Sequence, residues 1–281
     1  MKLTVLSENS VSAPQFLCEH GLSVHVCTSD CAVLLDMGAS DIFLANARAC
    51  GIDLSEVSCA VLSHGHYDHG GGIDAFLQIN PSAPVFLHDG AFAPLYSRRK
   101  EGLAFIGLSP SLNGHPRLHT IHCDEITSIC DHVCVFSGAD TSALSPAANK
   151  KLLLRTDSGD IPDPFAHEQY AVFEENGMLL LYTGCAHRGI VNIMHRFCSL
   201  FGRAPDVVAG GFHLGDPRNP LAFDASFCEQ TAKALAAFQN TRYLTGHCTG
   251  TAPYEILSKA LGTRLMKLTT GAQFDLQQPL S

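Results

Sequence analysis

The sequence predicts a layered α/β domain, and three observations support this fold class. Short β-rich runs and helical segments alternate along the whole chain, a mixture typical of sheets covered by helices. The 281 residues are 46% hydrophobic and only 16% charged, which is enough apolar material for a substantial core. No internal repeat, linker or low-complexity segment interrupts the chain, so residues 1–281 are expected to form a single domain.

The individual elements follow from hydrophobic periodicity and from the Gly, Ser and Asp residues between them. Helices show apolar side chains at helical spacing, and one is followed directly by Gly51, a typical helix end. The segment from residue 91 to about 164 carries most of the prolines and is expected to be less regular. The expected strands are residues 3–6, 22–27, 32–36, 59–62, 85–87, 169–173, 178–182, 207–209 and 243–244, and the expected helices are residues 40–50, 73–79, 190–201 and 223–238.

Composition excludes several classes of protein. The net charge of −9 argues against a nucleic-acid binder, because neutralising phosphates requires clustered Lys and Arg. The first six residues turn polar at Ser7, too early for the apolar centre of a signal peptide, and no run approaches the ~20 apolar residues that span a bilayer. We therefore expect a cytoplasmic protein that acts on a small molecule without nucleic acid or membrane, and a homo-oligomer is left open.

Twelve cysteines are scattered through the chain without any Cys-x-x-Cys pair. A zinc ribbon or a thioredoxin-type site would need such pairs. In a large domain without an export signal, most of these residues are expected to be small, reduced, buried thiols.

The densest group of chemically active residues is His64-Gly65-His66-Tyr67-Asp68-His69, which follows an apolar strand directly. Imidazole and carboxylate are preferred ligands of zinc and similar cations. The glycines in and after this segment allow the backbone to fold so that the side chains converge. A single histidine would more often be structural, but four potential ligands at this density predict a metal site.

This segment resembles the H-x-H-x-D-H signature of the metallo-β-lactamase superfamily. The run from Val33 to Gly38 is similar to that superfamily's strand ending in an Asp-x-Gly turn. The resemblance covers nearly the whole chain and implies a four-layer αβ/βα sandwich with two metal ions at one edge of the paired sheets. It further implies that His64 and His66 bind one metal, and that Asp68 and His69 bind the other.

The remaining ligands are expected downstream, at the ends of later strands. His247, in Thr245-Gly246-His247-Cys248, fits the superfamily's last histidine. Where the superfamily usually has a bridging Asp after Gly, this chain has Cys185, so either Cys185 binds as a thiolate or His187 takes over. His187 is the favoured ligand. Cys185 and His167, which stands near the place of the superfamily's third histidine, are additional candidates, and an ordinary buried thiol remains the alternative for Cys185.

Further motifs resemble a narrower branch, labelled 7,8-dihydropterin-6-methyl-4-(β-D-ribofuranosyl)aminobenzene 5'-phosphate synthase. They are Glu19-His20-Gly21-Leu22-Ser23, the segment 184–192, Gly210-Gly211-Phe212-His213-Leu214 and the segment 246–250. His213 is expected to contact substrate or a developing oxyanion, with a buried structural role as the alternative. No chemistry is assigned to His20. Arg98 and Arg99 are expected either to hold an anionic group of the substrate or to form, with Lys100, a solvated surface run.

These features predict a dinuclear metallohydrolase in which Asp68 orients a hydroxide and His213 contacts the substrate. Two zinc ions are expected, with iron or manganese as substitutes, and the substrate is a small, anionic ester, phosphoester or pterin-like molecule. A pterin or ribosyl-phosphate synthase or transferase is the alternative. A di-iron redox protein is disfavoured, since His66 stands where the oxygen-reducing members carry Glu. A metal-binding module without catalysis remains a further alternative, because fold does not determine reaction.

Overall fold

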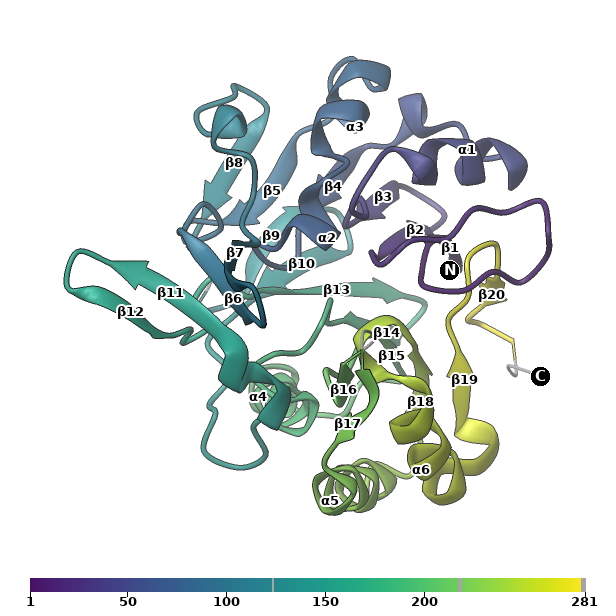
Figure 1. Ribbon diagram of the computed structural model, residues 1–281. Coiled ribbons are helices and arrows are strands. Elements are labelled where there is room, and N and C mark those ends of the chain that lie inside the picture. Colours follow the sequence, from purple (N-terminus) through teal and green to yellow (C-terminus); the bar gives the residue numbers. More distant parts are fainter. Residues whose placement is uncertain (123, 217–218, 279–281) are drawn as a thin grey trace. The chain divides into compact units, whose positions relative to one another are not determined.

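The computed structural model describes residues 1–122, 124–216 and 219–278, and the chain divides into two compact units. Unit 1 contains residues 1–122, 150–169 and 269–280, whereas unit 2 contains residues 123–149 and 170–268. Each unit has its own seven-stranded sheet and its own helices (Figure 1). The expectation of a single domain stays a prediction.

The main sheet of unit 1 has antiparallel strands at one side and parallel strands at the other. β1, β2, β3 and β20 pair antiparallel, while β3, β4, β5 and β8 are parallel neighbours. The carboxyl ends of parallel strands share one edge of a sheet, so the loops after β3, β4 and β5 leave from the same edge. In sheet order the strands are β20 (Gln273–Asp275), β1 (Lys2–Ser7), β2 (Ser23–Cys27), β3 (Ala32–Leu35), β4 (Cys59–Val61), β5 (Val85–His88) and β8 (Leu118–Ile121).

Helices cover one face of this sheet because their apolar sides pack on alternate strand residues. Phe43 of α1 and Phe76 of α3 are fully buried in one cluster with Leu34, Ala60 and Val85 of the strands. The helical segments of the unit are α1 (Ile42–Ala49), α2 (Tyr67–Gly70) and α3 (Ile73–Ile79), with the short 3-10 turns Leu54–Glu56 and Pro110–Leu112.

The segment 91–164 is more regular than the sequence predicts. Two hairpins in unit 1 form an antiparallel sheet in the order β12 (Gly159–Pro162), β11 (Leu152–Thr156), β6 (Leu95–Arg99) and β7 (Gly102–Phe105). β7 and β12 are exposed at nearly every position, so the alternation that marks a half-buried strand is absent from these two strands. The pairing of β6 with β11 joins the two hairpins, and a small apolar cluster of Leu95, Ile106, Leu152 and Phe165 packs against them.

The sheet of unit 2 repeats the pattern of antiparallel strands beside parallel ones. β14, β15, β18 and β19 are parallel, and the remaining pairs are antiparallel. In sheet order the strands are β19 (Leu265–Lys267), β18 (Arg242–Thr245), β15 (Val207–Gly210), β14 (Met178–Tyr182), β13 (Tyr170–Glu175), β10 (Val133–Phe136) and β9 (Thr127–Cys130), with a small pair β16 (Gly215–Asp216) and β17 (Asn219–Phe223) beside them.

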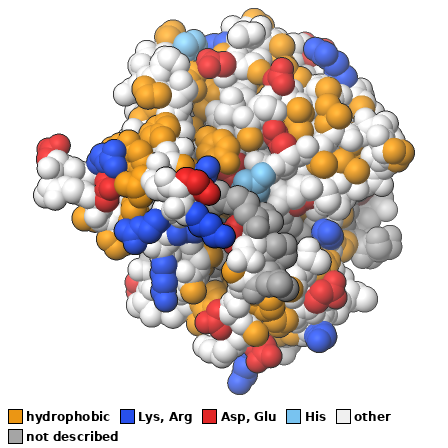
Figure 2. Space-filling model, in the orientation of Figure 1, with side chains coloured by type: hydrophobic (Ala, Val, Ile, Leu, Met, Phe, Trp, Pro, Cys, Tyr) orange, Lys and Arg blue, Asp and Glu red, His pale blue; other side chains and the backbone are white. Residues whose placement is uncertain are grey.

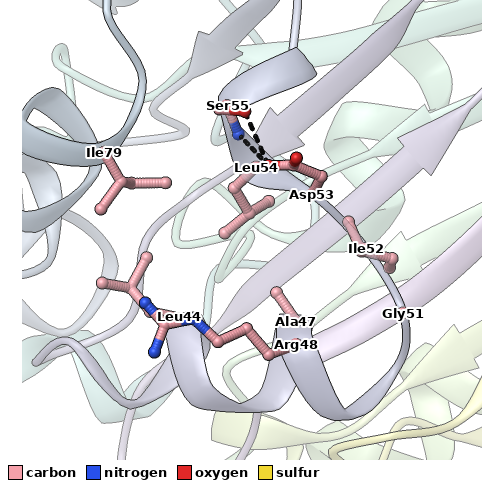
Figure 3. Close-up of a pocket in the computed structure, with 9 residues that line it drawn as sticks. All are labelled: Leu44, Ala47, Arg48, Gly51, Ile52, Asp53, Leu54, Ser55 and Ile79. Atoms are coloured by element: carbon pink, nitrogen blue, oxygen red, sulfur yellow. Dashed lines mark hydrogen bonds between the residues drawn. The ribbon is translucent and has the colours of Figure 1, made fainter.

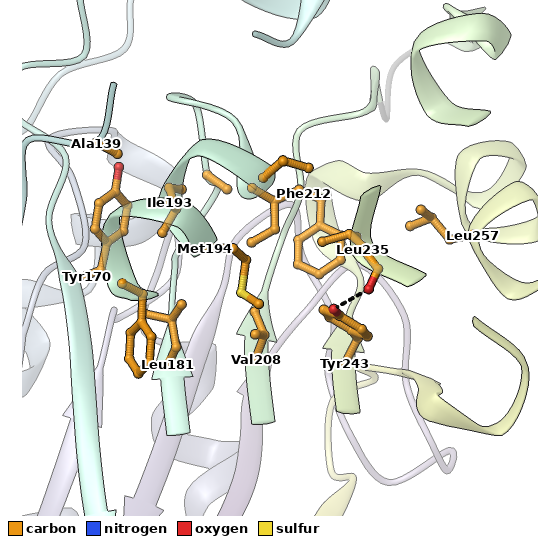
Figure 4. Packing of buried hydrophobic residues seen from close by; sticks show 14 of the residues in the cluster. Ala139, Tyr170, Leu181, Ile193, Met194, Val208, Phe212, Leu235, Tyr243 and Leu257 are labelled. Atoms are coloured by element: carbon orange, nitrogen blue, oxygen red, sulfur yellow. Dashed lines mark hydrogen bonds between the residues drawn. The ribbon is translucent and has the colours of Figure 1, made fainter. Parts of the chain in front are cut away.

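Three helices cover one face of this second sheet: α4 (Ile190–Phe201), α5 (Ala225–Ala236) and α6 (Thr251–Leu261). Met194, Leu235 and Leu257, one from each helix, pack with Leu181 and Val208 of the strands (Figure 4). The buried hydroxyl of Tyr243 donates to the Leu235 carbonyl at 2.8 Å, so this large side chain leaves no unpaired hydroxyl in the core. Helix α6 is absent from the sequence prediction, because Pro253 resembles a helix breaker but lies in the first turn, where proline is tolerated.

Candidate metal centre

The H-x-H-x-D-H segment lies immediately beyond β4 in unit 1, and its four predicted ligands are buried. His64, His66, Asp68 and His69 are each at most 8% exposed. The ring centroid of His64 lies 4.6 Å from that of His66 and 4.2 Å from that of His69. Burial lowers the pKa of His66 to about 3, so this ring is neutral at pH 7. Neutral imidazole is the form that binds metal.

A buried carboxylate that the sequence analysis treats only as part of a turn holds two of these rings. Asp36 follows β3 and is fully buried. Its Oδ2 lies 2.7 Å from His69 Nδ1 and accepts from the Ser63 hydroxyl at 2.7 Å, while its Oδ1 accepts from the Ser63 amide. The Ser63 hydroxyl in turn lies 2.9 Å from His64 Nδ1. Both rings are thus held through Nδ1, which fixes their orientation as outer partners do for metal-binding histidines.

The close approach of backbone around the motif explains its central glycine. A Cβ at Gly65 would collide with the Ala91 carbonyl, so no larger residue fits between His64 and His66. Gly65 N–H donates to His167 Nδ1 at 3.1 Å, and His167 Nε2 lies 3.1 Å from Asp163 Oδ2. Burial alone would raise the pKa of Asp163, but the His167 ring and the hydrogen bond from the Phe165 amide together outweigh this effect and lower the pKa.

Both ring nitrogens of His167 are therefore engaged within unit 1, and its donor atom lies within 4.8 Å of those of His66 and Asp163. This geometry supports a role in holding the Gly65 backbone. The alternative, a ligand role for His167, stays a prediction.

A second group, of two predicted residues and one that was not predicted, lies in unit 2 at the carboxyl ends of three adjacent parallel strands. Cys185 follows β14, His213 follows β15, and Cys248 follows β18. All three are buried, and one donor atom from each lies within 4.8 Å of the others. The interactions with Cys185 and His213 lower the pKa of Cys248 well below its usual range, against the opposite effect of burial. Two thiols and an imidazole form a donor set that suits zinc or iron.

The two other predicted ligands of unit 2 lie beside this cluster. His187 is buried, its ring centroid lies 4.2 Å from that of His213, and its Nδ1 lies 3.1 Å from the Asn149 side-chain oxygen. His247 is buried and directly precedes Cys248. Ala186, His213 and His247 all have positive φ angles between 48° and 56°, an uncommon conformation outside glycine that concentrates at functional sites.

Arg98 and Arg99 lie at the outer end of the β6–β7 hairpin, and both are exposed. The base of this hairpin contacts the motif, because Tyr67 N–H donates to the Ile106 carbonyl and Ile106 pairs with Leu95. Arg98 is three strand residues farther out, roughly 10 Å along the strand. Lys and Arg side chains gather with apolar ones over this region in Figure 2. A solvated surface run explains this placement, and an anion-binding role stays a prediction.

A pocket of about 430 Å³ opens elsewhere on unit 1, between α1, α3 and the turn Leu54–Glu56 (Figure 3). Leu44, Ile52 and Ile79 line it together with Arg48, and Asp53 is already bonded to Ser55. None of the described residues that line it is a predicted site residue. It therefore gives no support to the predicted chemistry.

Sequence reasoning does not assign Asp36, Ser63, Cys248 or His20 to the site. The first two carry one signal, their positions at the ends of neighbouring parallel strands: Asp36 directly follows β3, and Ser63 stands two residues after β4. Cys248 directly follows His247, a predicted ligand, and this position could have indicated a role. In a chain with twelve cysteines, however, one more cysteine is weak evidence for metal binding. The described cysteines are all free thiols, and Cys123 lies outside the described residues.

Comparison with known proteins identifies the family. Residues 18–247 match the family described as the metallo-beta-lactamase superfamily. The chain belongs to this superfamily. The sequence is also 25% identical over 256 residues to a 7,8-dihydropterin-6-methyl-4-(beta-D-ribofuranosyl)-aminobenzene-5'-phosphate synthase of Methanocaldococcus jannaschii, covering 84% of this chain and 82% of the relative.

Solved structures of superfamily members are similar over almost their full length. The structure described as Tm1679, a metal-dependent hydrolase of the beta-lactamase superfamily, has a TM-score of 0.81 and 29% identity, and 98% of each chain is covered. Zinc-bound PqqB from Methylobacterium extorquens has a TM-score of 0.61 and 16% identity, over 98% of this chain and 100% of the other. These similarities confirm the predicted metallo-β-lactamase fold class. No helix within the described ranges has the length and apolar character needed to cross a membrane.

Proposed function

We propose that this superfamily member is a dinuclear metal-dependent hydrolase acting on a small anionic substrate. The observation that carries the proposal is the Asp36–Ser63 network, which holds the buried rings of His64 and His69 through Nδ1. Such outer hydrogen bonds fix the orientation and increase the basicity of metal-binding histidines. The proposed ligands are His64, His66, Asp68, His69, His187 and His247, with Cys185 and His167 as additional candidates.

The donor set fits zinc first and iron or manganese second, because it combines imidazoles with a carboxylate and a nearby thiol. Two such ions would supply a hydroxide nucleophile near neutral pH and polarise a carbonyl or phosphoryl oxygen. Asp68 would contribute negative charge and orient the attacking group. His213 would contact the substrate, and Arg98 or Arg99 would attract its anionic part.

Elemental analysis of protein expressed with added zinc, iron or manganese tests the metal requirement. We expect about two ions per chain, since six strong ligands exceed one tetrahedral site. Less than one ion per chain would contradict the proposal.

A screen of phosphodiesters, thioesters, lactones and pterin derivatives then tests hydrolysis. The curated relative is named as a synthase. Condensation of a pterin with a ribosyl phosphate, without hydrolysis of any substrate, would instead favour a synthase or transferase.

Replacing His213 by Ala is expected to lower turnover on the order of 10²-fold or more, while metal content is retained, because the change removes a proposed transition-state contact. Metal content and kcat are measured together. His195→Ala is the control, since His195 is an exposed residue of α4 in the same unit. Loss of metal in the His213 variant would instead make this residue a ligand together with Cys185 and Cys248. If the His213→Ala variant kept wild-type turnover, His213 would have only a structural role.

A further inference from the structure

His20 belongs to the Glu19-His20-Gly21 segment, to which neither the sequence nor the proposed function gives a role. Its Nε2 lies 3.3 Å from Asp68 Oδ2, and its Nδ1 lies 3.4 Å from Asn9 Oδ1. The Asp68 side chain is 12% exposed, whereas that of His20 is 39% exposed. An ionised carboxylate can only accept hydrogen bonds, so His20 Nε2–H is the donor in this contact.

The residues on either side of His20 hold it in place. The Glu19 carboxylate accepts from the amides of Ala39 and Ser40 at 2.9 and 3.2 Å, and from the Ser40 hydroxyl at 2.6 Å. These bonds tie the segment to the turn that follows Asp36. The Ser7 hydroxyl is a fourth donor to this carboxylate, at 3.2 Å, so the start of the segment has little freedom to move.

Gly21 brings the other side of the segment directly against the metal motif. A Cβ at Gly21 would lie 2.6 Å from Ala39 N and 2.9 Å from the Asp68 carbonyl oxygen, so only glycine fits here. Leu22 N–H donates to the same Asp68 carbonyl at 3.1 Å. The segment is thus bonded to the backbone of Asp68 while His20 contacts its side chain. The imidazole itself is too exposed to serve mainly in packing.

We propose that His20 is a positioning residue that holds one oxygen of the Asp68 carboxylate and so orients its other oxygen for metal binding. The inference rests on the proposed ligand role of Asp68. Carboxylates that bind metal are commonly held by such outer hydrogen bonds, and losing one typically costs 10–100-fold in metal affinity or activity.

The test compares four variants with the wild type by the rate at which the metal-loaded protein releases metal to excess EDTA. His20→Ala removes the donor and should accelerate release about 10–100-fold. His20→Gln retains an N–H donor at a similar reach and should release metal at close to the wild-type rate. His20→Glu places a second carboxylate against Asp68 and should release metal faster than the Ala variant. His119→Ala, an exposed histidine of the same unit, serves as the matched control.

Wild-type release from the Ala variant, or equal release from the Ala and Gln variants, would overturn the inference. The melting temperature of each metal-free variant identifies any general loss of folding. If the Glu variant does not fold, the comparison of the Gln and Ala variants still tests the inference. A wild-type protein that binds metal but hydrolyses no tested substrate would contradict only the proposed hydrolase. A wild-type protein that binds no metal would contradict both.

Discussion

Asp68→Asn is expected to lose metal and activity together. The substitution keeps the size of the side chain but removes the negative charge that a metal ion requires, and it weakens the contact with His20. We expect turnover to fall by more than the 10–100-fold cost of losing an outer-sphere partner, because Asp68 is itself a proposed ligand. Metal content and kcat/KM are measured on the same preparation.

Asp74→Asn is the matched control for this variant. Asp74 is exposed in the first turn of α3, close to the motif in sequence but outside it. Its loss should cost at most about 1 kcal/mol through the helix dipole and should leave metal content unchanged. If Asp68→Asn retained wild-type metal and turnover, Asp68 would be neither a ligand nor a catalytic group, and the H-x-H-x-D-H assignment would need revision.

Asp36→Ala should produce the largest loss of stability among the described variants. Asp36 is fully buried and bonded to both Ser63 and His69, so its removal leaves buried donors unsatisfied. Each buried donor that is left unsatisfied costs about 1–3 kcal/mol. Its φ of 53° adds strain for Ala, whereas Asn tolerates this conformation. We therefore expect Asp36→Asn to lower the free energy of unfolding less than Asp36→Ala does. It should still lower it, because the amide group of Asn would face the donors on Ser63 and His69.

Urea unfolding of the metal-free proteins measures the stability change, and chelator competition measures metal affinity. Asn46→Ala is the control, because Asn46 is equally buried and holds three backbone groups in the same unit, away from the motif. It should lower stability while metal affinity remains normal. Asp36→Ala should lower both, with a 10–100-fold fall in affinity. An Asp36→Ala protein that binds metal as tightly as the wild type would show that the network supports folding alone.

Sequence patterns predicted the elements whose apolar residues follow a clear period. The observed α3, β14 and α4 have the predicted boundaries, because each combines strong periodicity with a distinct end such as Gly189 or Gly202. The hairpins within residues 91–164 were not predicted, since their stability comes from pairing between distant segments. β20 was missed for the same reason: a three-residue edge strand has no pattern of its own.

The candidate site also has one part that the sequence predicts and another that it does not. Residue type and spacing point to the candidate ligands of the H-x-H-x-D-H segment, because several side chains of metal-binding types occur within six positions. The partners that orient them do not show in local sequence. Asp36 lies 27 residues from Ser63 and 33 from His69, and only the parallel pairing of β3 with β4 brings these groups together. Likewise, the sequence does not distinguish Cys248 from an ordinary buried thiol, and only the structure shows that it lies close to Cys185 and His213.

The pairing of β20 with β1 constrains the order in which a nascent chain can fold. Unit 1 is discontinuous, and its edge strand comes from residues 273–275, after all of unit 2. Chains emerge from the ribosome at about 5–20 residues per second, so the β1 edge must wait on the order of ten seconds or more for its partner. During that interval the backbone groups along β1 are open to pairing with another chain. Slow translation of the last segment should therefore increase aggregation of newly made protein, and chaperone binding near residues 2–7 should suppress it.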